Sequence, residues 1–378
     1  MLALTSCVAL FGSNSLVLSP ISPDIAADYG TSVRFVMTAA AAYGFGTAAG
    51  ALFLARYIDR WGALRVLTWA LGLFALALAA SSLAPAPLLL TAAQALAGLA
   101  AGISLPAIYA HAAQVAAPGR ESKTIGFVLT GWTISMVVGV SLSAAIADLL
   151  HWRAIFGLLS GLAVVTAAIL ALGNRSVATL DGALAPSPWK AARIPGVARL
   201  LLVCTAFMIS FYGVYGYLGD HLQSSLAVST SAAGLVTLAY GIGFGLAAFF
   251  DGALDRFQSA RTMPLAYLAV MVAYLAIALA SGSYLALLCA VVLWGLLNHF
   301  GLNLLIVRLT AIDPAQRGTI MGLNSTVTYL AVFAGTLGFG PVYSAGGLPL
   351  AAYLAAGLCA AAALLAAVRR WPHAQPAS

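Results

Sequence analysis

Long apolar stretches follow one another along the whole chain, and short polar breaks separate them. Each stretch has roughly 18 to 25 residues, enough for a helix to cross a hydrocarbon core of about 30 Å. Barrel strands would instead alternate apolar and polar residues, so the pattern predicts helices with local kinks at Gly and Pro. Twelve spans are expected, near residues 2–19, 35–55, 66–84, 87–115, 124–147, 153–173, 199–219, 231–250, 262–281, 284–308, 319–343 and 348–368.

The composition excludes a soluble fold. Hydrophobic residues make up 62% of the 378 positions and charged residues only 7%, and the mean hydropathy is +1.01. A water-soluble domain does not have this balance. The first span has no basic segment before it and no convincing small-residue cleavage site after it, so we expect a membrane helix there rather than a signal peptide.

Two short charged strings indicate a tandem duplication. Residues 59–65 read Asp-Arg-Trp-Gly-Ala-Leu-Arg, and residues 255–261, which lie 196 positions later, read Asp-Arg-Phe-Gln-Ser-Ala-Arg. The string 42–46 recurs at 239–243, one residue out of step. A repeat of this size predicts two similar halves, which can rock against each other around a central site. We therefore expect an all-α membrane protein whose twelve transmembrane helices form two pseudo-symmetric six-helix bundles, residues 1–173 and 199–370, with a cytoplasmic linker at 174–198 and a cytoplasmic tail at 371–378.

The basic residues report the orientation of the chain in the membrane. The net charge is +7, and fifteen of the seventeen Lys and Arg residues fall on alternate loops, with only Arg34 and Arg153 on the other side. The positive-inside rule then places both termini in the cytoplasm. No basic cluster alternates with exposed aromatic residues, so we expect no nucleic-acid partner.

The loop between the second and third spans resembles the G-x-x-x-D-R-x-G-R-R motif of the major facilitator superfamily. Asp59, Arg60, Gly62 and Arg65 match the motif, whereas the leading Gly is replaced by Ala55. The resemblance covers essentially the whole chain, and residues 23–32 and 152–156 resemble the bacterial exporter branch of the family. It implies a multi-pass protein of the bacterial inner membrane, expected to be a monomer, whose partners are lipid and a small-molecule substrate. It implies no enzymatic activity, no cofactor and no metal.

The same resemblance implies a gate at the cytoplasmic end. A carboxylate there can pair with an Arg and accept hydrogen bonds from a helix N-terminus of the other half. Asp59 is expected to face the chain near 317–319, and Asp255 the chain near 123–124. The alternative is that these residues are solvated loop charges that obey the sidedness rule. The expected gating residues are Asp59, Arg60, Gly62, Arg65, Asp255, Arg256 and Arg261.

A candidate substrate pocket follows from the helices that line the cavity in this family, the first, fourth, seventh and tenth. Asparagine is costly in a bilayer unless it is paired, which favours a hydrated cavity. The side chains are neutral and aromatic, which suits uncharged or amphipathic organic solutes. The expected substrate-binding residues are Asn14, Gln94, Tyr109, Tyr212, Tyr215, Asn298, His299 and Asn303.

His299 is the candidate for proton coupling. All ten Asp and Glu residues map to loops or to helix ends, so no carboxylate is expected in the middle of the membrane. A titratable side chain within a span is a functional candidate by default. The alternative is that His299 only forms a hydrogen bond between helices.

Three kinds of function remain at this point. The favoured interpretation is a secondary active transporter that works by proton-coupled efflux. The alternative is a proton-coupled uptake carrier or an uncoupled facilitator of a small neutral metabolite, because Gln94 stands where proton-coupled exporters of the family place an Arg. A membrane enzyme or receptor is disfavoured, since the chain has no Walker loop, no HExxH and no GxSxG.

Overall fold

Residues 1–54, 57–115, 121–172, 188–250, 261–313 and 316–367 are described by a computed structural model. Among them, eleven helices are long and apolar enough to cross a membrane. The last of these, α15 (Arg317–Ala367), departs from helical geometry at Gly346 and Gly347. Gly347 has φ +64°, a left-handed conformation that favours glycine. This break divides α15 into the two spans expected at 319–343 and 348–368, so the prediction of twelve spans is confirmed.

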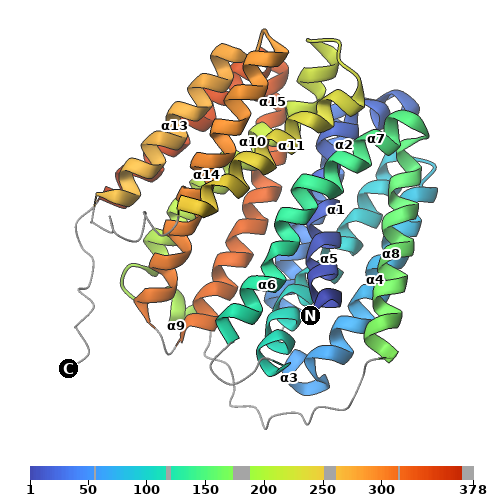
Figure 1. Ribbon diagram of the computed structural model, residues 1–378, viewed down its shortest axis with the longest axis vertical. Helices are drawn as coiled ribbons and strands as arrows, with labels where there is room; N and C mark the ends of the chain where they lie inside the picture. The colour runs from blue at the N-terminus through green and yellow to red at the C-terminus, as the bar shows by residue number, and fades with distance from the viewer. Residues whose placement is uncertain (55–56, 116–120, 173–187, 251–260, 314–315, 368–378) are drawn as a thin grey trace.

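The first half of the chain contains α1 (Leu2–Tyr29), α2 (Val33–Ala49) with its π-helical end η1 (Gly50–Leu54), α3 (Tyr57–Trp61), α4 (Ala63–Leu83), α5 (Pro87–Val115), α6 (Glu121–Ile134), η2 (Ser135–Val140), α7 (Ser141–Leu149) and α8 (Trp152–Leu172). The segments α6, η2 and α7 follow one another as one span. Within this bundle, α5 packs against α2 and α4, and α4 packs against α8. The bundle runs from blue to green in Figure 1.

The second half contains α9 (Pro188–Ala192), α10 (Val197–Ser224), α11 (Thr230–Ala247) with the short η3 (Ala248–Phe250), α13 (Thr262–Ala280), α14 (Tyr284–Ile312) and α15. Within this bundle, α15 packs against α10 and α13, and α14 packs against α11 and α13. The bundle runs from yellow-green to red in Figure 1. The expected tail lies outside the described residues, and only the part of the expected linker from residue 188 onward lies within them.

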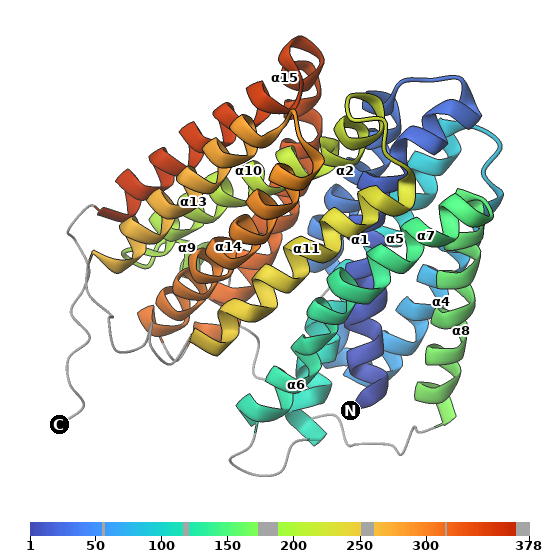
Figure 2. The same ribbon diagram turned by 45° about the horizontal axis from the view of Figure 1, so that its top comes forward.

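The most extensive contacts between the two bundles are made by pairs of long helices. These pairs are α1 with α10, α2 with α15, and α7 with α11. We call the end of the molecule where α1 begins the terminal end and the opposite end the distal end. Figure 2 shows the bundles close together toward the distal end and diverging toward the terminal end.

Helix α1 is longer than the sequence pattern predicts. We expected a span at 2–19 followed by a polar segment, but α1 continues through Pro20 and Pro23 to Tyr29. Proline inside a helix removes one backbone hydrogen bond, which is why the pattern predicted an end there. In a membrane helix such a proline is tolerated when other groups satisfy the freed carbonyl oxygens.

The duplication is visible in two equivalent helix crossings, α2 with α5 and α11 with α14, where a glycine lets the backbones come close. A Cβ atom placed on Gly46 of α2 would lie 2.2 Å from the carbonyl oxygen of Ala95 on α5. A Cβ atom on Gly243 of α11 would lie 2.0 Å from the carbonyl oxygen of Val292 on α14. Small residues permit this close approach of helix backbones in membranes. The second glycine and its partner each stand 197 positions after the first pair, so the same helix crossing is built twice.

Candidate functional site

Helices α1 and α10 cross where the two prolines of α1 free backbone carbonyl groups. A proline cannot donate to the carbonyl four residues earlier, so Leu16 and Ser19 each lose their helix partner. The hydroxyl of Ser22 donates to the Ser19 carbonyl oxygen at 3.1 Å. The hydroxyl of Tyr215, which lies on α10, donates to the Leu16 carbonyl oxygen at 3.2 Å. Pro20 therefore leaves a carbonyl oxygen of α1 free to accept a hydrogen bond from the other bundle.

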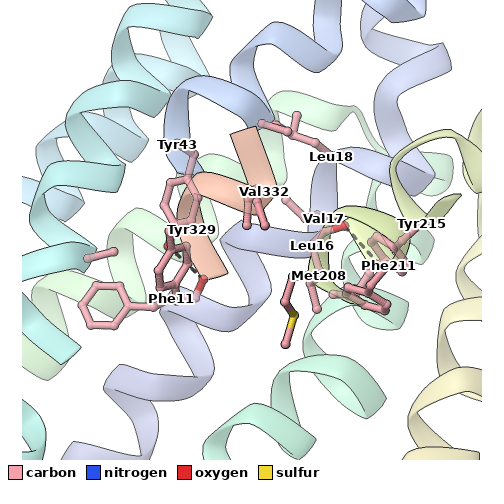
Figure 3. Close-up of a cluster of buried hydrophobic side chains, with 14 of the residues drawn as sticks. Phe11, Leu16, Val17, Leu18, Tyr43, Met208, Phe211, Tyr215, Tyr329 and Val332 are labelled. Carbon is pink, nitrogen blue, oxygen red and sulfur yellow. Dashed lines mark hydrogen bonds between the residues drawn. The ribbon is translucent and has the colours of Figure 1, made fainter. Parts of the chain in front are cut away.

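A small, half-open cavity lies beside this crossing and has room for about one water molecule. The hydroxyl oxygen of Ser15 lines it, is buried, and has no hydrogen-bond partner among the described residues. Figure 3 shows Leu16 and Val17 of α1 between Val332 of α15 and Tyr215 of α10, so both bundles meet here. The lining residues are Ser15, Leu16, Leu18, Ser19, Met37, Ala40, Tyr212, Tyr215, Gly216, Val332 and Thr336.

Aromatic side chains form the wall of the C-terminal bundle next to the cavity. The ring of Phe211 lies 5.5 Å from that of Tyr215 and 5.3 Å from those of Tyr240 and Trp294, measured between centroids. The amide nitrogen of Asn298 donates to the hydroxyl of Tyr240 at 3.1 Å. Asn298 is only 1% exposed and does not face lipid. Its hydrogen bond instead fixes the hydroxyl of Tyr240 within the aromatic cluster.

Two other expected pocket residues bind each other inside the N-terminal bundle. The amide nitrogen of Asn14 donates to the side-chain oxygen of Gln94 at 2.9 Å. The amide nitrogen of Gln94 donates to the hydroxyl of Ser81 at 3.0 Å. Asn14 is 1% exposed and Gln94 is fully buried. In this state both amides are satisfied within the bundle and closed to solvent.

The remaining expected pocket residues are partly exposed. Tyr109 lies on α5, Tyr212 on α10, and His299 and Asn303 on α14. The ring of His299 packs edge-on against Phe244 of α11, with centroids 4.8 Å apart. The structure therefore separates the expected pocket into a sealed group and a partly open group. Among the described residues, no group of three or more His, Cys, Asp or Glu side chains is placed to hold a metal ion.

The expected terminal gate is described only in part. Asp255 and Arg256 lie outside the described residues, and so do the side chains of Asp59 and Arg60, although their backbone belongs to α3. Gly62 has φ +83° and caps the start of α4, so the motif's glycine is required by a left-handed turn. Arg65 and Arg261 are exposed near the starts of α4 and α13.

The distal end carries contacts between the bundles that the sequence pattern did not predict. The side-chain nitrogen of Gln223 donates to the carbonyl oxygen of Pro20 at 2.6 Å. The hydroxyl of Thr230 donates to the carboxylate of Asp24 at 2.8 Å, and the backbone N–H of Ser231 donates to the carboxylate of Asp148 at 3.3 Å. Ser229-Thr230-Ser231 is a recognisable helix start. Nothing in the sequence indicates that carboxylates of the other half would reach it.

A second cluster at the distal end ties the loops of the N-terminal bundle together. The guanidinium group of Arg153 forms an ion pair with Asp28 and donates to the Ala84 carbonyl oxygen at 3.0 Å. It also lies over the ring of Trp152, 4.2 Å from the centroid. The two exporter-like segments, 23–32 and 152–156, therefore meet in space. Their shared role here is to hold α1 against α8.

Comparison with known proteins identifies the architecture. The sequence profile of the Major Facilitator Superfamily matches residues 2–336 and, in an overlapping match, residues 200–378. The "Uncharacterized MFS-type transporter YwfA" of Bacillus subtilis (strain 168) is 30% identical over 372 residues, covering 96% of this chain and 89% of that protein. A "Probable sugar efflux transporter" of Helicobacter acinonychis (strain Sheeba) is 22% identical over 233 residues, covering 60% of this chain and 56% of that protein.

The fold also matches a solved structure. The crystal structure of a bacterial homologue of the human lysosomal transporter Spinster, in an inward-facing and occupied conformation, superimposes with a TM-score of 0.75. The sequence identity is 16%, and the match covers 96% of this chain and 93% of that one. At this identity the likeness establishes the fold alone.

Proposed function

The chain belongs to the major facilitator superfamily and is a membrane transporter, and from this premise we propose that it moves a small organic solute by alternating access in proton-coupled efflux. The observation that carries the proposal is the seam between the bundles. Its hydrogen bonds at Leu16, Pro20, Asp24 and Asp148 are gathered toward the distal end, and the bundles diverge toward the terminal end (Figure 2). Bundles bonded together at one end and diverging at the other are the arrangement expected of one of the two states that alternating access requires.

The chemistry of the seam favours an uncharged solute. The cavity beside the α1–α10 crossing offers hydroxyl groups, among them that of Ser15, together with aromatic and aliphatic surface. Neutral polar groups recognise neutral hydrogen-bonding solutes, whereas phosphate esters call for arginines. We place the solute against the partly open residues Tyr109, Tyr212, His299 and Asn303. Asn14, Gln94 and Asn298 then support this surface from within each bundle.

The proposed orientation follows from the positive-inside rule. The terminal end faces the cytoplasm of a bacterium, both termini are cytoplasmic, and the protein acts as a monomer in the inner membrane. The terminal gate stays a proposal with the same residues, Asp59 and Asp255 with their neighbouring arginines. Asp59→Ala is expected to abolish transport at an unchanged protein level, and unaltered transport in that variant would remove the assignment.

A thermal-shift screen of metabolites and drugs tests solute binding first, because a ligand of the folded state raises its stability by mass action. The best hit, radiolabelled, is then followed in proteoliposomes under an imposed pH gradient. Proton movement is reported by a pH-sensitive dye. Solute accumulation driven by protons that move in the opposite direction supports proton-coupled efflux. Solute movement that equilibrates regardless of pH contradicts it.

The alternative function is a proton-coupled uptake carrier or an uncoupled facilitator of a small neutral metabolite. The observation that favours it is the Asn14–Gln94 pair. Gln94 occupies the position of the exporters' arginine but is neutral and fully buried in this state. Equilibration of the solute that is unaffected by an imposed pH gradient, or accumulation in the same direction as protons, would select this alternative.

A further inference from the structure

The first turn of α11 is held at the distal end by groups from the other bundle. A helix start leaves backbone N–H groups without intrahelical partners. Ser229 satisfies one of them, since its hydroxyl oxygen accepts from the N–H of Ala232 at 3.2 Å. Asp148, at the end of α7, satisfies another by accepting from the N–H of Ser231 at 3.3 Å. The cap of α11 is therefore shared between the two bundles.

A second carboxylate reaches the same turn from α1. Thr230 is 4% exposed, and its hydroxyl donates to the carboxylate of Asp24 at 2.8 Å. Negative charge beside a helix N-terminus is favourable because of the helix dipole. The other charged or titratable groups of this region are His151, which lies 3.8 Å from Asp28 and also acts electrostatically on Asp24, and Asp220 and His221 of α10. Asp24 and Asp148 are thus the carboxylates that hold α11.

Close packing beside these contacts makes them sensitive to separation of the bundles. The hydroxyl of Ser141 on α7 donates to the carbonyl oxygen of Gly234 on α11 at 3.2 Å. A Cβ atom on Gly234 would lie 2.5 Å from the Cβ of Ala144. Opening the distal end has to move α11 away from α7 and α1. The carboxylates of Asp24 and Asp148 would then lose their hydrogen bonds to the first turn of α11 and bind water instead.

We infer that Asp24 and Asp148 are gating residues of the transport cycle, a two-carboxylate lock whose hydrogen bonds to the first turn of α11 favour the distal-closed state. The inference rests on the proposed alternating-access function and extends it to the end of the molecule opposite the Asp59 motif. The position equivalent to Asp24 in the other half makes a different contact. Asp220 stands 196 residues after Asp24, at the equivalent position, yet its carboxylate accepts from Tyr343 of its own bundle at 2.6 Å.

The experiment measures the two states directly and needs no substrate. Spin labels at the exposed positions Leu83 and Ala345, one in each bundle at the distal end, report opening by double electron–electron resonance in lipid nanodiscs. A second pair of exposed positions, Leu172 and Ala311, reports the terminal end. The four native cysteines are replaced in the background. Asp24→Asn and Asp148→Asn keep the size of the side chain and remove the charge.

Each single variant is expected to raise the ratio of distal-open to distal-closed molecules about threefold, and the double variant more, because an amide oxygen is a weaker hydrogen-bond acceptor than a carboxylate. The Leu172–Ala311 distances should shorten at the same time. Asp220→Asn is the matched control and should leave the distance distributions of both label pairs unchanged. Asp24→Glu, which keeps the carboxylate, should keep the closed state of the parent protein.

An unchanged distribution in the Asp24→Asn/Asp148→Asn variant overturns the inference, and so does an equal shift in Asp220→Asn. If the double variant does not fold, Thr230→Val, which removes only the hydroxyl bound to Asp24, gives the same reading with a smaller shift. Failure to find a transported solute would count against the proposed function but would leave these distance distributions as they are, so the two failures are distinguishable.

Discussion

The hydroxyl of Ser19 on α1 donates a hydrogen bond to the backbone carbonyl of Tyr215 on α10, and the two residues stand 196 positions apart. The same offset separates Asp59 from Asp255 in the duplicated motif. Ser19 and Tyr215 therefore occupy equivalent positions in the two halves and touch each other. Equivalent positions can meet only beside the approximate two-fold axis that relates the bundles. The contact lies between the Tyr215–Leu16 and Gln223–Pro20 hydrogen bonds of the distal seam, so it has to part when the bundles rock open at that end.

Tyr215→Phe tests the hydrogen bond that accompanies this contact. The variant leaves the Leu16 carbonyl oxygen without a donor, because Pro20 cannot supply one. A buried polar group left unpaired costs about 1–3 kcal/mol. We expect the apparent free energy of unfolding in detergent to fall by that amount, and the distal-open population to rise, as measured by thermal unfolding and by the Leu83–Ala345 distances.

Pro20→Ala provides the control, since alanine restores an N–H that can donate to Leu16 within the helix. In the Pro20→Ala background, Tyr215→Phe should cost clearly less than in the parent protein. The coupling between the two sites is then read from a double-mutant cycle. Additive effects of the two substitutions would show that the proline does not create the acceptor used by Tyr215.

The fold followed closely from the apolar pattern, and the exceptions have physical causes. The span expected at 87–115 begins with α5 at Pro87 and stays helical to Val115, where the described residues pause. The end of α1 was missed: the pattern ended the span at residue 19, whereas the helix continues to Tyr29. Two prolines and two aspartates there are typical of a loop. Ser22 and Arg153 satisfy the Ser19 carbonyl and Asp28 within the bundle, whereas the Leu16 carbonyl, the Pro20 carbonyl and Asp24 are satisfied by residues of the other bundle. Such long-range compensation has no local signal.

Gln94 is expected to support the N-terminal bundle through Asn14. Replacing Gln94 by Leu removes the acceptor of the Asn14 amide and the donor to Ser81, all within a buried region. We expect a loss of about 1–3 kcal/mol in stability, measured as a lower thermal midpoint in the absence of solute. Asn14→Leu in the same protein should then cost less than it does alone.

A different outcome would reassign the pair. If Gln94→Leu leaves the thermal midpoint unchanged but removes the solute-induced shift, the amide contacts solute in the transport cycle and its burial here belongs to one state only. The sequence identified both residues as polar groups within spans, but it could not tell a pair that is satisfied internally from one that faces a cavity. That distinction depends on which face of each helix is turned toward the cavity. These helices are apolar on nearly all faces, so the apolar pattern does not define that face.

The repeated helix crossings predict a matched pair of glycine effects. Gly46→Ala and Gly243→Ala each place a methyl group against a backbone carbonyl, at 2.2 Å and 2.0 Å respectively, so the helices must move apart. Overpacking of this kind costs about 1–3 kcal/mol or more. Gly72→Ala in α4, where nothing lies within 4 Å of the added methyl group, should stay within about 1 kcal/mol of the parent. Equal thermal midpoints for all three variants would contradict the close approach of α2 to α5 and of α11 to α14.

His299→Ala separates proton coupling from packing at the partly open surface. The His299 ring lies against Phe244 of α11, so its position near the junction of α14 and α11 allows either role. If it carries the coupled proton, the variant should still show the solute-induced thermal shift but lose accumulation driven by the pH gradient. His151→Ala, which changes an exposed histidine at the distal end, should keep both. Full gradient-driven accumulation in His299→Ala would remove the histidine from the coupling mechanism and would favour a role confined to packing against Phe244.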